Sequence, residues 1–114
     1  MEHVEDDYKA LNELYRVIKN KGTLIAQIPL DKNLTKTFED KEIIDPRERN
    51  KYFGQYDHVR VYGLDFYARL ANSGFIPKKI DILKKTSMGK KLNIVYLKMK
   101  KYLLELQSNK LPIF

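Results

Sequence analysis

The most constraining feature of the sequence is an amphipathic segment that leads, through a single glycine, into a short apolar run. Within residues 5–19, apolar side chains recur every three or four positions, which predicts a helix with one apolar face. These side chains are Tyr8, Leu11, Leu14, Tyr15 and Ile18. The acidic residues Glu5, Asp6 and Asp7 lie where the helix dipole favours negative charge. Gly22 follows the helix and tolerates the left-handed conformation that commonly ends one.

The apolar run Thr23–Ile28 is bounded by Gly22 and Pro29. A short and nearly continuous apolar run predicts a strand that helices cover on both faces, as happens in a parallel sheet. A helix, a tight glycine turn and a buried strand together form half of a βαβ unit. The sequence therefore predicts an α/β fold that contains part of a parallel sheet.

Residues 31–62 are rich in turn-forming residues and predict a long, mostly irregular connection. Within it, Arg47–Phe53 has the pattern of a short helix opened by Asp45 and Pro46, because proline is favoured in the first helical turn. Residues 58–62 fit either a brief strand or an ordered loop. A connection of this length in a small domain usually carries function or covers a site.

The sequence from residue 63 onward predicts a second helix followed by a strand. The helix runs over residues 63–73 and ends at Gly74. Its predicted apolar face consists of Leu64, Tyr67, Leu70 and Ala71, with Phe66 beside Leu70. Residues 78–83 alternate between apolar and polar side chains, which predicts a half-buried strand.

The C-terminal stretch fits two patterns. Asn93–Met99 has the alternation of a strand, with Val95, Leu97 and Met99 on one face. Residues 90–107 also carry a helical stripe over a longer window without a helix-breaking residue, so we predict a helix there. Residues 108–114 are expected to form a loose tail.

The size and composition of the chain exclude several classes of protein. With 114 residues, of which 43% are hydrophobic, the chain can form one small domain with an apolar core. It has no apolar run of membrane-spanning length, no apolar signal segment near its start, and no cysteine for a disulfide or a zinc thiolate site. We therefore expect a cytoplasmic protein that does not enter a membrane.

The chain has a net charge of +7, and lysines gather between residues 78 and 101 while residues 1–14 are acidic. A basic segment of this kind fits either a polyanion-binding surface or an ordinary solvated surface. We favour the solvated surface, because the segment lacks zinc-finger and aromatic RNA-binding motifs and has little interleaved arginine or glycine. We therefore expect no nucleic acid among the partners.

Three segments of the chain occur in an order that resembles one family of enzymes. The first begins with Glu2-His3-Val4-Glu5-Asp6-Asp7 and continues to Gly22 and the strand at residues 23–28; the second is FGQYDHVRVYG at 53–63; the third is FYARLANSGF at 66–75. Together they resemble the C-terminal half of class I S-adenosylmethionine-dependent methyltransferases, in the group related to ubiquinone and menaquinone methylases. The resemblance covers residues 2–83, with Asn20-Lys21-Gly22 in place of the usual Pro-Gly-Gly turn. It implies a partial Rossmann-like sheet: helix, strand, long loop, helix and strand, then a C-terminal helix or strand.

The resemblance also shows what the 114 residues lack. In the family, S-adenosylmethionine binds beside a glycine-rich turn after the first strand, and an acidic residue ending the second strand binds the ribose. This chain has no G-x-G-x-G pattern, and its 5 glycines are dispersed. We therefore expect a methyltransferase-like fragment that is inactive alone and binds no S-adenosylmethionine by itself. The alternatives are half of a split methyltransferase completed by a partner chain, and a basic polyanion-binding module without catalysis.

The missing half also bears on assembly. Without the strands that precede it in the family, the strand at residues 23–28 should lie at an open edge of the sheet. The apolar face of the helix at residues 5–19 should likewise be bare. Both features favour self-association, so we expect a homo-oligomer or a complex with a complementary N-terminal half.

Residues 86–114 depart from the family pattern. Family members close with one more strand, antiparallel to the one before, and back-translation of residues 89–104 in a shifted frame comes closer to that ending than the printed residues. We therefore divide the chain into a methyltransferase portion, residues 1–85, and a divergent tail, residues 86–114. We hypothesise a frameshift near residues 86–90, which sequencing the gene would test.

The resemblance implies several candidate site residues. Glu2 and His3 match a Glu-His pair close to the bound cofactor, although without the cofactor loop we expect them to be exposed here. His58 is the catalytic candidate, because its segment covers the active-site mouth and imidazole can act as a base near neutral pH. The substrate-binding candidates are Gln55, Arg60 and Tyr62. Two histidines with no clustered carboxylate predict no metal site.

Overall fold

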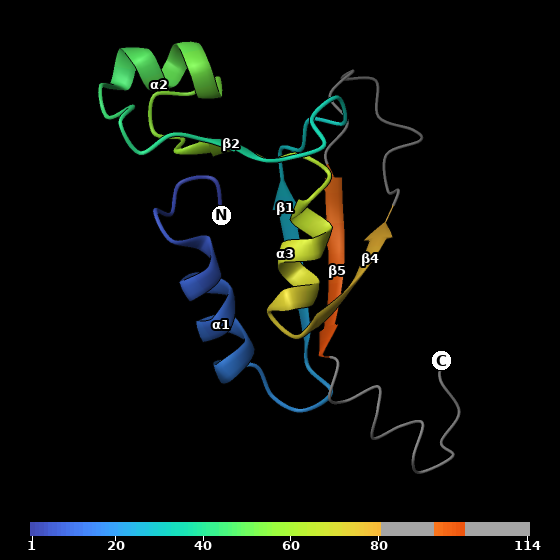
Figure 1. Ribbon diagram of the computed structural model, residues 1–114. Helices are drawn as coiled ribbons and strands as arrows, with labels where there is room; N and C mark the ends of the chain where they lie inside the picture. Colours follow the sequence, from blue (N-terminus) through green and yellow to red (C-terminus); the bar gives the residue numbers. More distant parts are fainter. Residues whose placement is uncertain (81–92, 100–114) are drawn as a thin grey trace.

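A computed structural model gives a mixed α/β fold, in which the described residues are 1–80 and 93–99. In chain order the elements are α1 (Asp7–Val17), β1 (Thr23–Ile28), β2 (Phe38–Glu39), α2 (Pro46–Phe53), β3 (Arg60–Val61), α3 (Phe66–Asn72), β4 (Phe75–Ile80) and β5 (Asn93–Met99). Figure 1 shows α1 and α3 beside the sheet of β1, β5 and β4, with β2 and α2 beyond the end of β1. The predicted combination of helices and sheet is thus confirmed.

The three-stranded sheet has the order β1-β5-β4, and β5 runs antiparallel to both neighbours. The register pairs Thr23 with Lys98 on one side of β5 and Phe75 with Met99 on the other. Because β1 and β4 are each antiparallel to β5, they run parallel to each other. The prediction that Thr23–Ile28 pairs within a parallel sheet is wrong for the described strands, since the strand beside β1 is antiparallel.

The predicted helix over residues 90–107 is wrong over Asn93–Met99, which form β5. This segment gains hydrogen-bonded neighbours on both sides as a strand. Pairing with distant strands overrides the local helical spacing that suggested the helix. The strand alternative is therefore confirmed. Residues 100–107, the tail at 108–114 and the end of the strand predicted over 78–83 lie outside the described residues.

Helix α1 begins after Asp6, whose carboxylate accepts a hydrogen bond from the backbone N–H of Lys9 at 2.9 Å. The helix ends at Val17, two residues before the predicted end. The left-handed residue that follows is Lys21, with a φ of 65°, and not Gly22 as predicted. Glycine is needed at position 22 for another reason, because a Cβ there would lie 2.6 Å from the carbonyl oxygen of Lys19.

Strand β1 packs on the helices with one face. Leu24, Ala26 and Ile28 contact the core, whereas Ile25 on the other face is 64% exposed. The prediction of a strand buried on both faces is therefore wrong, because the described helices cover one side of the sheet. The prediction of a bare apolar face on α1 is wrong for Leu11, which is buried in the core, and for Leu14 and Tyr15, which pack against it, whereas Tyr8 is exposed.

The core lies between α1, α3 and the sheet. Its buried members are Leu11, Ile28, Tyr62, Phe66, Leu70 and Phe75. Helix α3 begins at Phe66, three residues after the predicted start, so Leu64 lies before the helix and is exposed. Within the helix Phe66 and Leu70 are buried, whereas Ala71 of the predicted face is exposed. Gly74 ends this helix as predicted, with a φ of 92°, and β4 begins at once at Phe75, three residues earlier than predicted.

The connection between β1 and α3 is more ordered than its composition suggests. Strand β2 pairs antiparallel with β3, with Phe38 opposite Val61. Helix α2 forms where it was predicted, and the carboxylate of Asp45 caps it by accepting the N–H of Arg47 at 2.7 Å. The N–H of Asp31 donates to the carbonyl of Tyr62 at 2.8 Å, so β3 is fixed at the carboxyl end of β1.

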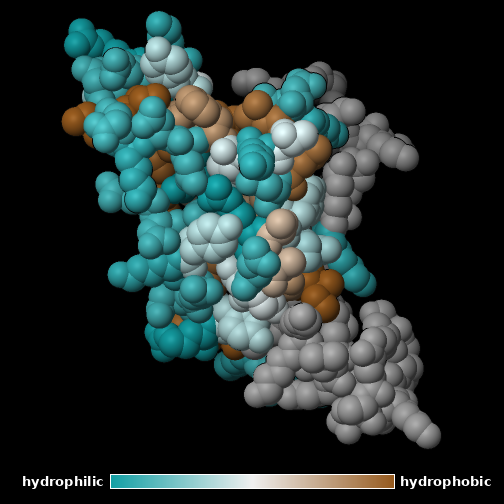
Figure 2. All heavy atoms as spheres, viewed as in Figure 1, coloured by the Kyte–Doolittle hydropathy of each residue, from teal (hydrophilic) through white to brown (hydrophobic). Residues whose placement is uncertain are grey.

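None of the helices in the described part of the chain is long and apolar enough to cross a membrane. On the face seen in Figure 2, hydrophobic side chains form separate patches among hydrophilic ones, and several patches lie over α2 and β2. The exposed apolar residues of the chain include Phe38, Ile44 and Tyr52. Apolar surface on this face is therefore dispersed.

Candidate functional site

The segment before α1 is fastened to β3 through its own main chain. The buried guanidinium of Arg60 donates hydrogen bonds to three carbonyl oxygens, those of Met1, Val4 and Glu5. The N–H of Val59 donates to the carbonyl of Glu2 at 2.8 Å. We call this set of bonds between residues 1–5 and residues 59–60 the N-terminal clamp. It makes neighbours of side chains that are far apart in the sequence.

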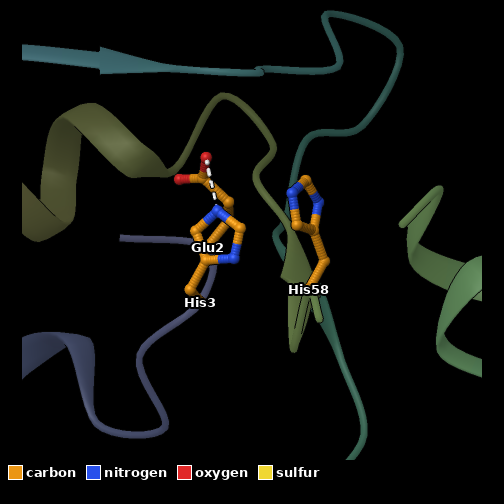
Figure 3. Close-up of side chains that lie close together, drawn as sticks. All are labelled: Glu2, His3 and His58. Atoms are coloured by element: carbon orange, nitrogen blue, oxygen red, sulfur yellow. Dashed lines mark ion pairs between the residues drawn. The ribbon is translucent and has the colours of Figure 1, made fainter. Parts of the chain in front are cut away.

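Glu2, His3 and His58 are the side chains that the N-terminal clamp brings together (Figure 3). Each has one oxygen or nitrogen atom within 4.8 Å of such an atom on the other two. His3 Nε2 lies 3.6 Å from Glu2 Oε1, and the two imidazole rings meet edge to face with centroids 4.7 Å apart. The Glu2 side chain is 13% exposed, so the prediction of an exposed residue is wrong for Glu2, whereas His3 is 47% exposed.

Asp57 adds a second carboxylate to this group. Its Oδ2 lies 3.1 Å from His3 Nδ1. Although Asp57 precedes His58 in the sequence, it pairs with His3. Its Oδ1 is buried without a hydrogen-bond partner among the described residues. The premise that the two histidines lack a clustered carboxylate is therefore wrong, because Glu2 and Asp57 both lie beside them.

His58 also lines a hollow at the carboxyl end of β1. The hollow is formed by Pro29, Leu30, Asp31, Lys32, Phe53, Gly54, His58, Arg60 and Val61. Of the three predicted substrate-binding residues, Gln55 is exposed, while Arg60 and Tyr62 are buried. His58 thus lies at the wall of this hollow, and its catalytic role stays a prediction.

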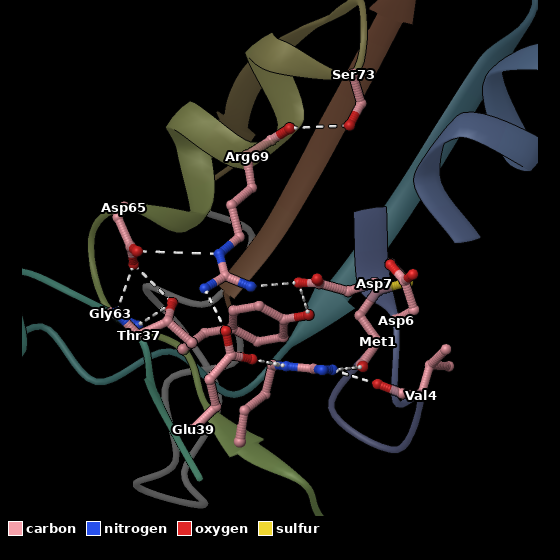
Figure 4. Close-up of polar contacts among 12 residues, drawn as sticks. Met1, Val4, Asp6, Asp7, Thr37, Glu39, Gly63, Asp65, Arg69 and Ser73 are labelled. Atoms are coloured by element: carbon pink, nitrogen blue, oxygen red, sulfur yellow. Dashed lines mark hydrogen bonds and ion pairs between the residues drawn. The ribbon is translucent and has the colours of Figure 1, made fainter. Parts of the chain in front are cut away.

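A partly buried ionic network lies next to the N-terminal clamp (Figure 4). Asp7 Oδ2 accepts hydrogen bonds from the Tyr62 hydroxyl and the Arg69 guanidinium, both at 2.8 Å. Glu39 bridges the two arginines, with Oε2 accepting from Arg60 at 2.8 Å and Oε1 from Arg69 at 3.0 Å. Asp7 is 3% exposed. The network therefore joins α1, β2, β3 and α3, and it occupies the Tyr62 hydroxyl inside the protein.

Burial and pairing shift the pKa values of these groups. Burial alone would raise the pKa of the Asp7 carboxyl, but hydrogen bonds from Tyr62 and Arg69 and the charge of Arg69 hold it below its ordinary 3.8. Burial would likewise raise the pKa of the Glu39 carboxyl, but Arg60 and Arg69 hold it below its ordinary 4.5. Burial, together with the bond to Asp7, raises the pKa of Tyr62. Both carboxyl groups are therefore ionised at neutral pH, opposite two arginines.

We predict that acid weakens the fold through Asp7 and Glu39. A carboxyl with a lower pKa in the folded chain stabilises the fold above its unfolded pKa, and this stabilisation is lost as the pH falls through the folded pKa. The free energy of unfolding, measured by urea titration between about pH 7 and pH 3, should therefore decrease below about pH 5. Asp7→Asn should make that decrease shallower, and an equally steep decrease in this variant would contradict the prediction.

The network is not predicted from the sequence. The sequence suggests only that Asp7 favours the helix dipole, although Asp7 precedes Leu11 and Leu14 by four and seven positions and so belongs to the inward face of α1. That spacing was the available signal. Glu39 and Arg69 carry no such signal, because they are 30 positions apart and only the fold brings them together.

In comparisons with known proteins, no protein-family model, no curated protein sequence and no solved structure matches this chain. Its function is therefore inferred from its residues and their geometry.

Proposed function

We propose that this chain is the C-terminal portion of a class I S-adenosylmethionine-dependent methyltransferase domain, inactive without a cofactor-binding half. The observation that carries the proposal is a convergence at the carboxyl end of β1. Two of the three methylase-like segments, residues 2–7 and 53–63, meet there through the N-terminal clamp. The third segment forms α3 and the start of β4, which pack on the same core.

The order of the elements gives further support. Helix α1 leads through a tight turn into β1, and α3 leads through Gly74 into β4. These two strands are mutually parallel, as strands that each follow a helix are in α/β folds. The last strand, β5, is antiparallel to β4, which is how members of the methyltransferase family close. Strand β5 lies within residues 86–114, whose sequence departs from the family pattern although its pairing direction agrees with it. The frameshift near residues 86–90 stays a hypothesis for gene sequencing.

The proposal assigns the chain a role on the acceptor side of the reaction. Methyl transfer needs a nucleophile held in line with the sulfonium and shielded from water. His58, at the wall of the hollow, would take a proton from the acceptor, and the exposed Gln55 of the same segment would contact it. The 114 residues contain no glycine-rich turn. The other half would supply that turn and so bind the cofactor.

The first test is calorimetric titration of S-adenosylmethionine into the isolated chain. We expect no measurable binding, because these 114 residues contain neither the glycine-rich turn that lies beside the cofactor nor the acidic residue that binds its ribose. Micromolar affinity in the isolated chain would contradict the proposal that it is inactive alone.

The second test asks whether a complementary half exists. The DNA next to the gene should encode, in one of its frames, a strand, a glycine-rich turn and a helix, and co-expression of that product should restore micromolar cofactor binding. Restored binding would also establish a split enzyme. If no neighbouring frame encodes such a segment, the split-enzyme alternative loses its support and the chain stands as an inactive fragment.

We further propose that the chain self-associates through β1. This strand is at the edge of the described sheet, and Ile25 on its uncovered face is largely exposed. Light scattering should therefore report a dimer or a larger species, and Ile25→Lys should shift it towards the monomer, because lysine on an edge strand disfavours pairing. Leu64→Lys, at an exposed residue outside the sheet, is the matched control. A monomeric unmodified chain would overturn this prediction.

A further inference from the structure

We propose that Glu2, His3 and His58 form a binding site for a divalent transition-metal ion, with Zn²⁺ as the expected ion. The proposal goes beyond methyl transfer and does not depend on it; while an ion is bound, His58 is a ligand and cannot also take a proton from a methyl acceptor. It rests on three observations: the chemistry and spacing of the three side chains, the carboxylate behind His3, and the backbone bonds that hold the segments in place.

The three side chains have the chemistry of a zinc site. Two imidazoles and one carboxylate are the protein ligands of many zinc centres, which keep a further position open for water or substrate. Imidazole nitrogen suits zinc and its neighbouring transition metals, whereas Mg²⁺ and Ca²⁺ prefer oxygen ligands. The site should therefore select Zn²⁺, Co²⁺ or Ni²⁺ over the alkaline-earth ions.

The spacing permits an ion after a small closure. The candidate ligand atoms lie within 4.8 Å of one another. Tetrahedral zinc with ligands at about 2.0–2.1 Å separates its ligand atoms by about 3.4 Å. The widest pair must therefore close by at most about 1.4 Å, a shift that rotation of the side chains can provide. In Figure 3, His58 approaches the other two residues from a separate segment of the chain, so an ion would join the two segments.

Asp57 orients the His3 ring, because its carboxylate lies beside the ring nitrogen that would not bind the metal. A metal-bound histidine usually donates its second ring N–H to a carboxylate, which fixes the tautomer and makes the ligating nitrogen more basic. Here His3 Nδ1 lies 3.1 Å from Asp57 Oδ2, while His3 Nε2 lies 3.6 Å from Glu2 Oε1. The ring therefore presents Nε2 to the metal side of the cluster. The amine of Met1 pairs with the other Glu2 oxygen, Oε2, at 3.2 Å.

The main chain holds the ligands in place before an ion arrives. The Val59 N–H bonds the carbonyl of Glu2, and the His58 N–H bonds the carbonyl of Gln55 at 3.2 Å. Arg60 does not oppose a cation strongly, because its guanidinium charge is paired with Glu39 and its other N–H groups donate to main-chain carbonyls. Since His58 also lines the hollow at the end of β1, the open metal position would be available to an oxygen or sulfur atom of a small molecule.

The test is titration of the chain, without a polyhistidine tag, with Co²⁺ followed by visible absorption and by competition with Zn²⁺. We expect one ion per chain and micromolar or tighter dissociation constants. His58→Asn and Glu2→Gln should each abolish or weaken binding by at least about tenfold, and Asp57→Asn should weaken it by about tenfold. The chain has 2 histidines, so no other imidazole can replace His58.

Asp31→Asn is the matched control, because Asp31 lines the same hollow and is not one of the three ligands. It should leave the Co²⁺ affinity unchanged. Circular dichroism of each variant separates a lost ligand from a lost fold, and the partly exposed Asp57 offers a variant that spares the core. The proposal is overturned if the unmodified chain binds no Co²⁺, or if folded His58→Asn binds it as tightly as the unmodified chain. Because the measurement is metal binding, its failure is distinct from a failure to bind S-adenosylmethionine.

Discussion

Asp7→Ala is expected to lower the free energy of unfolding by about 3–5 kcal/mol. The Asp7 carboxylate is buried and accepts hydrogen bonds from both Tyr62 and Arg69. Its removal leaves a buried arginine that retains Glu39, whose side chain is partly exposed. A buried charge without its nearest partner is less favourable than no charge at all. Urea denaturation followed by circular dichroism at neutral pH measures the loss.

Two variants separate this effect from general damage to the helix. Glu13→Ala removes another carboxylate of α1, but the Glu13–Arg16 pair is exposed, so we expect a loss of no more than about 0.5 kcal/mol. Tyr62→Phe removes one hydrogen bond and leaves the Asp7–Arg69 ion pair, so about 1–2 kcal/mol is expected. A loss in Asp7→Ala no larger than that in Glu13→Ala would show that the network does not hold the fold together.

Phe66→Ala should be comparably severe, with a loss of about 3–5 kcal/mol in the free energy of unfolding. Phe66 is fully buried, and its ring lies 4.6 Å, centroid to centroid, from the ring of Tyr62. Truncation leaves a cavity between α3 and the rest of the core, and it also removes apolar surface that folding takes out of water. The same urea titration applies, and the variant should keep the native circular dichroism spectrum at low denaturant if its remaining stability allows.

Leu64→Ala is the informative control for Phe66, because the helical spacing of the sequence places Leu64 on the buried face and the structure exposes it. We expect its effect to stay within about 0.5 kcal/mol, as for most surface substitutions. If Leu64→Ala were the more damaging of the two, the exposed position of Leu64 just before α3 would be wrong.

Local signals in the sequence predicted the elements whose cause is local. Asp45 and Pro46 start α2, Gly74 ends α3, and the apolar spacing around Leu11 gives α1 its inward face. Each of these features depends on residues within a few positions of one another. For the same reason the errors at their boundaries are small, such as the left-handed residue at Lys21 in place of Gly22.

The features that the sequence did not predict depend on residues far apart in the chain. The segment at 93–99 becomes a strand because two distant strands flank it, and β1 pairs antiparallel for the same reason. The candidate site shows the same division. His58 and Glu2 were selected from a family resemblance, but their contact follows from Arg60 binding the carbonyls of residues 1–5, and no local pattern marks that arginine.

The position of β5 has a consequence for the order in which this protein can fold. The middle strand of the sheet is the last described strand to be synthesised, so β1 and β4 lack their shared neighbour until residues 93–99 have left the ribosome. The bond between Tyr62 and Asp7 likewise spans 55 positions, and that between Arg69 and Asp7 spans 62. Contacts between such distant residues slow folding, because a long loop must close before they form. Helix α1 therefore lacks both buried partners of Asp7 until residues 62 and 69 have left the ribosome.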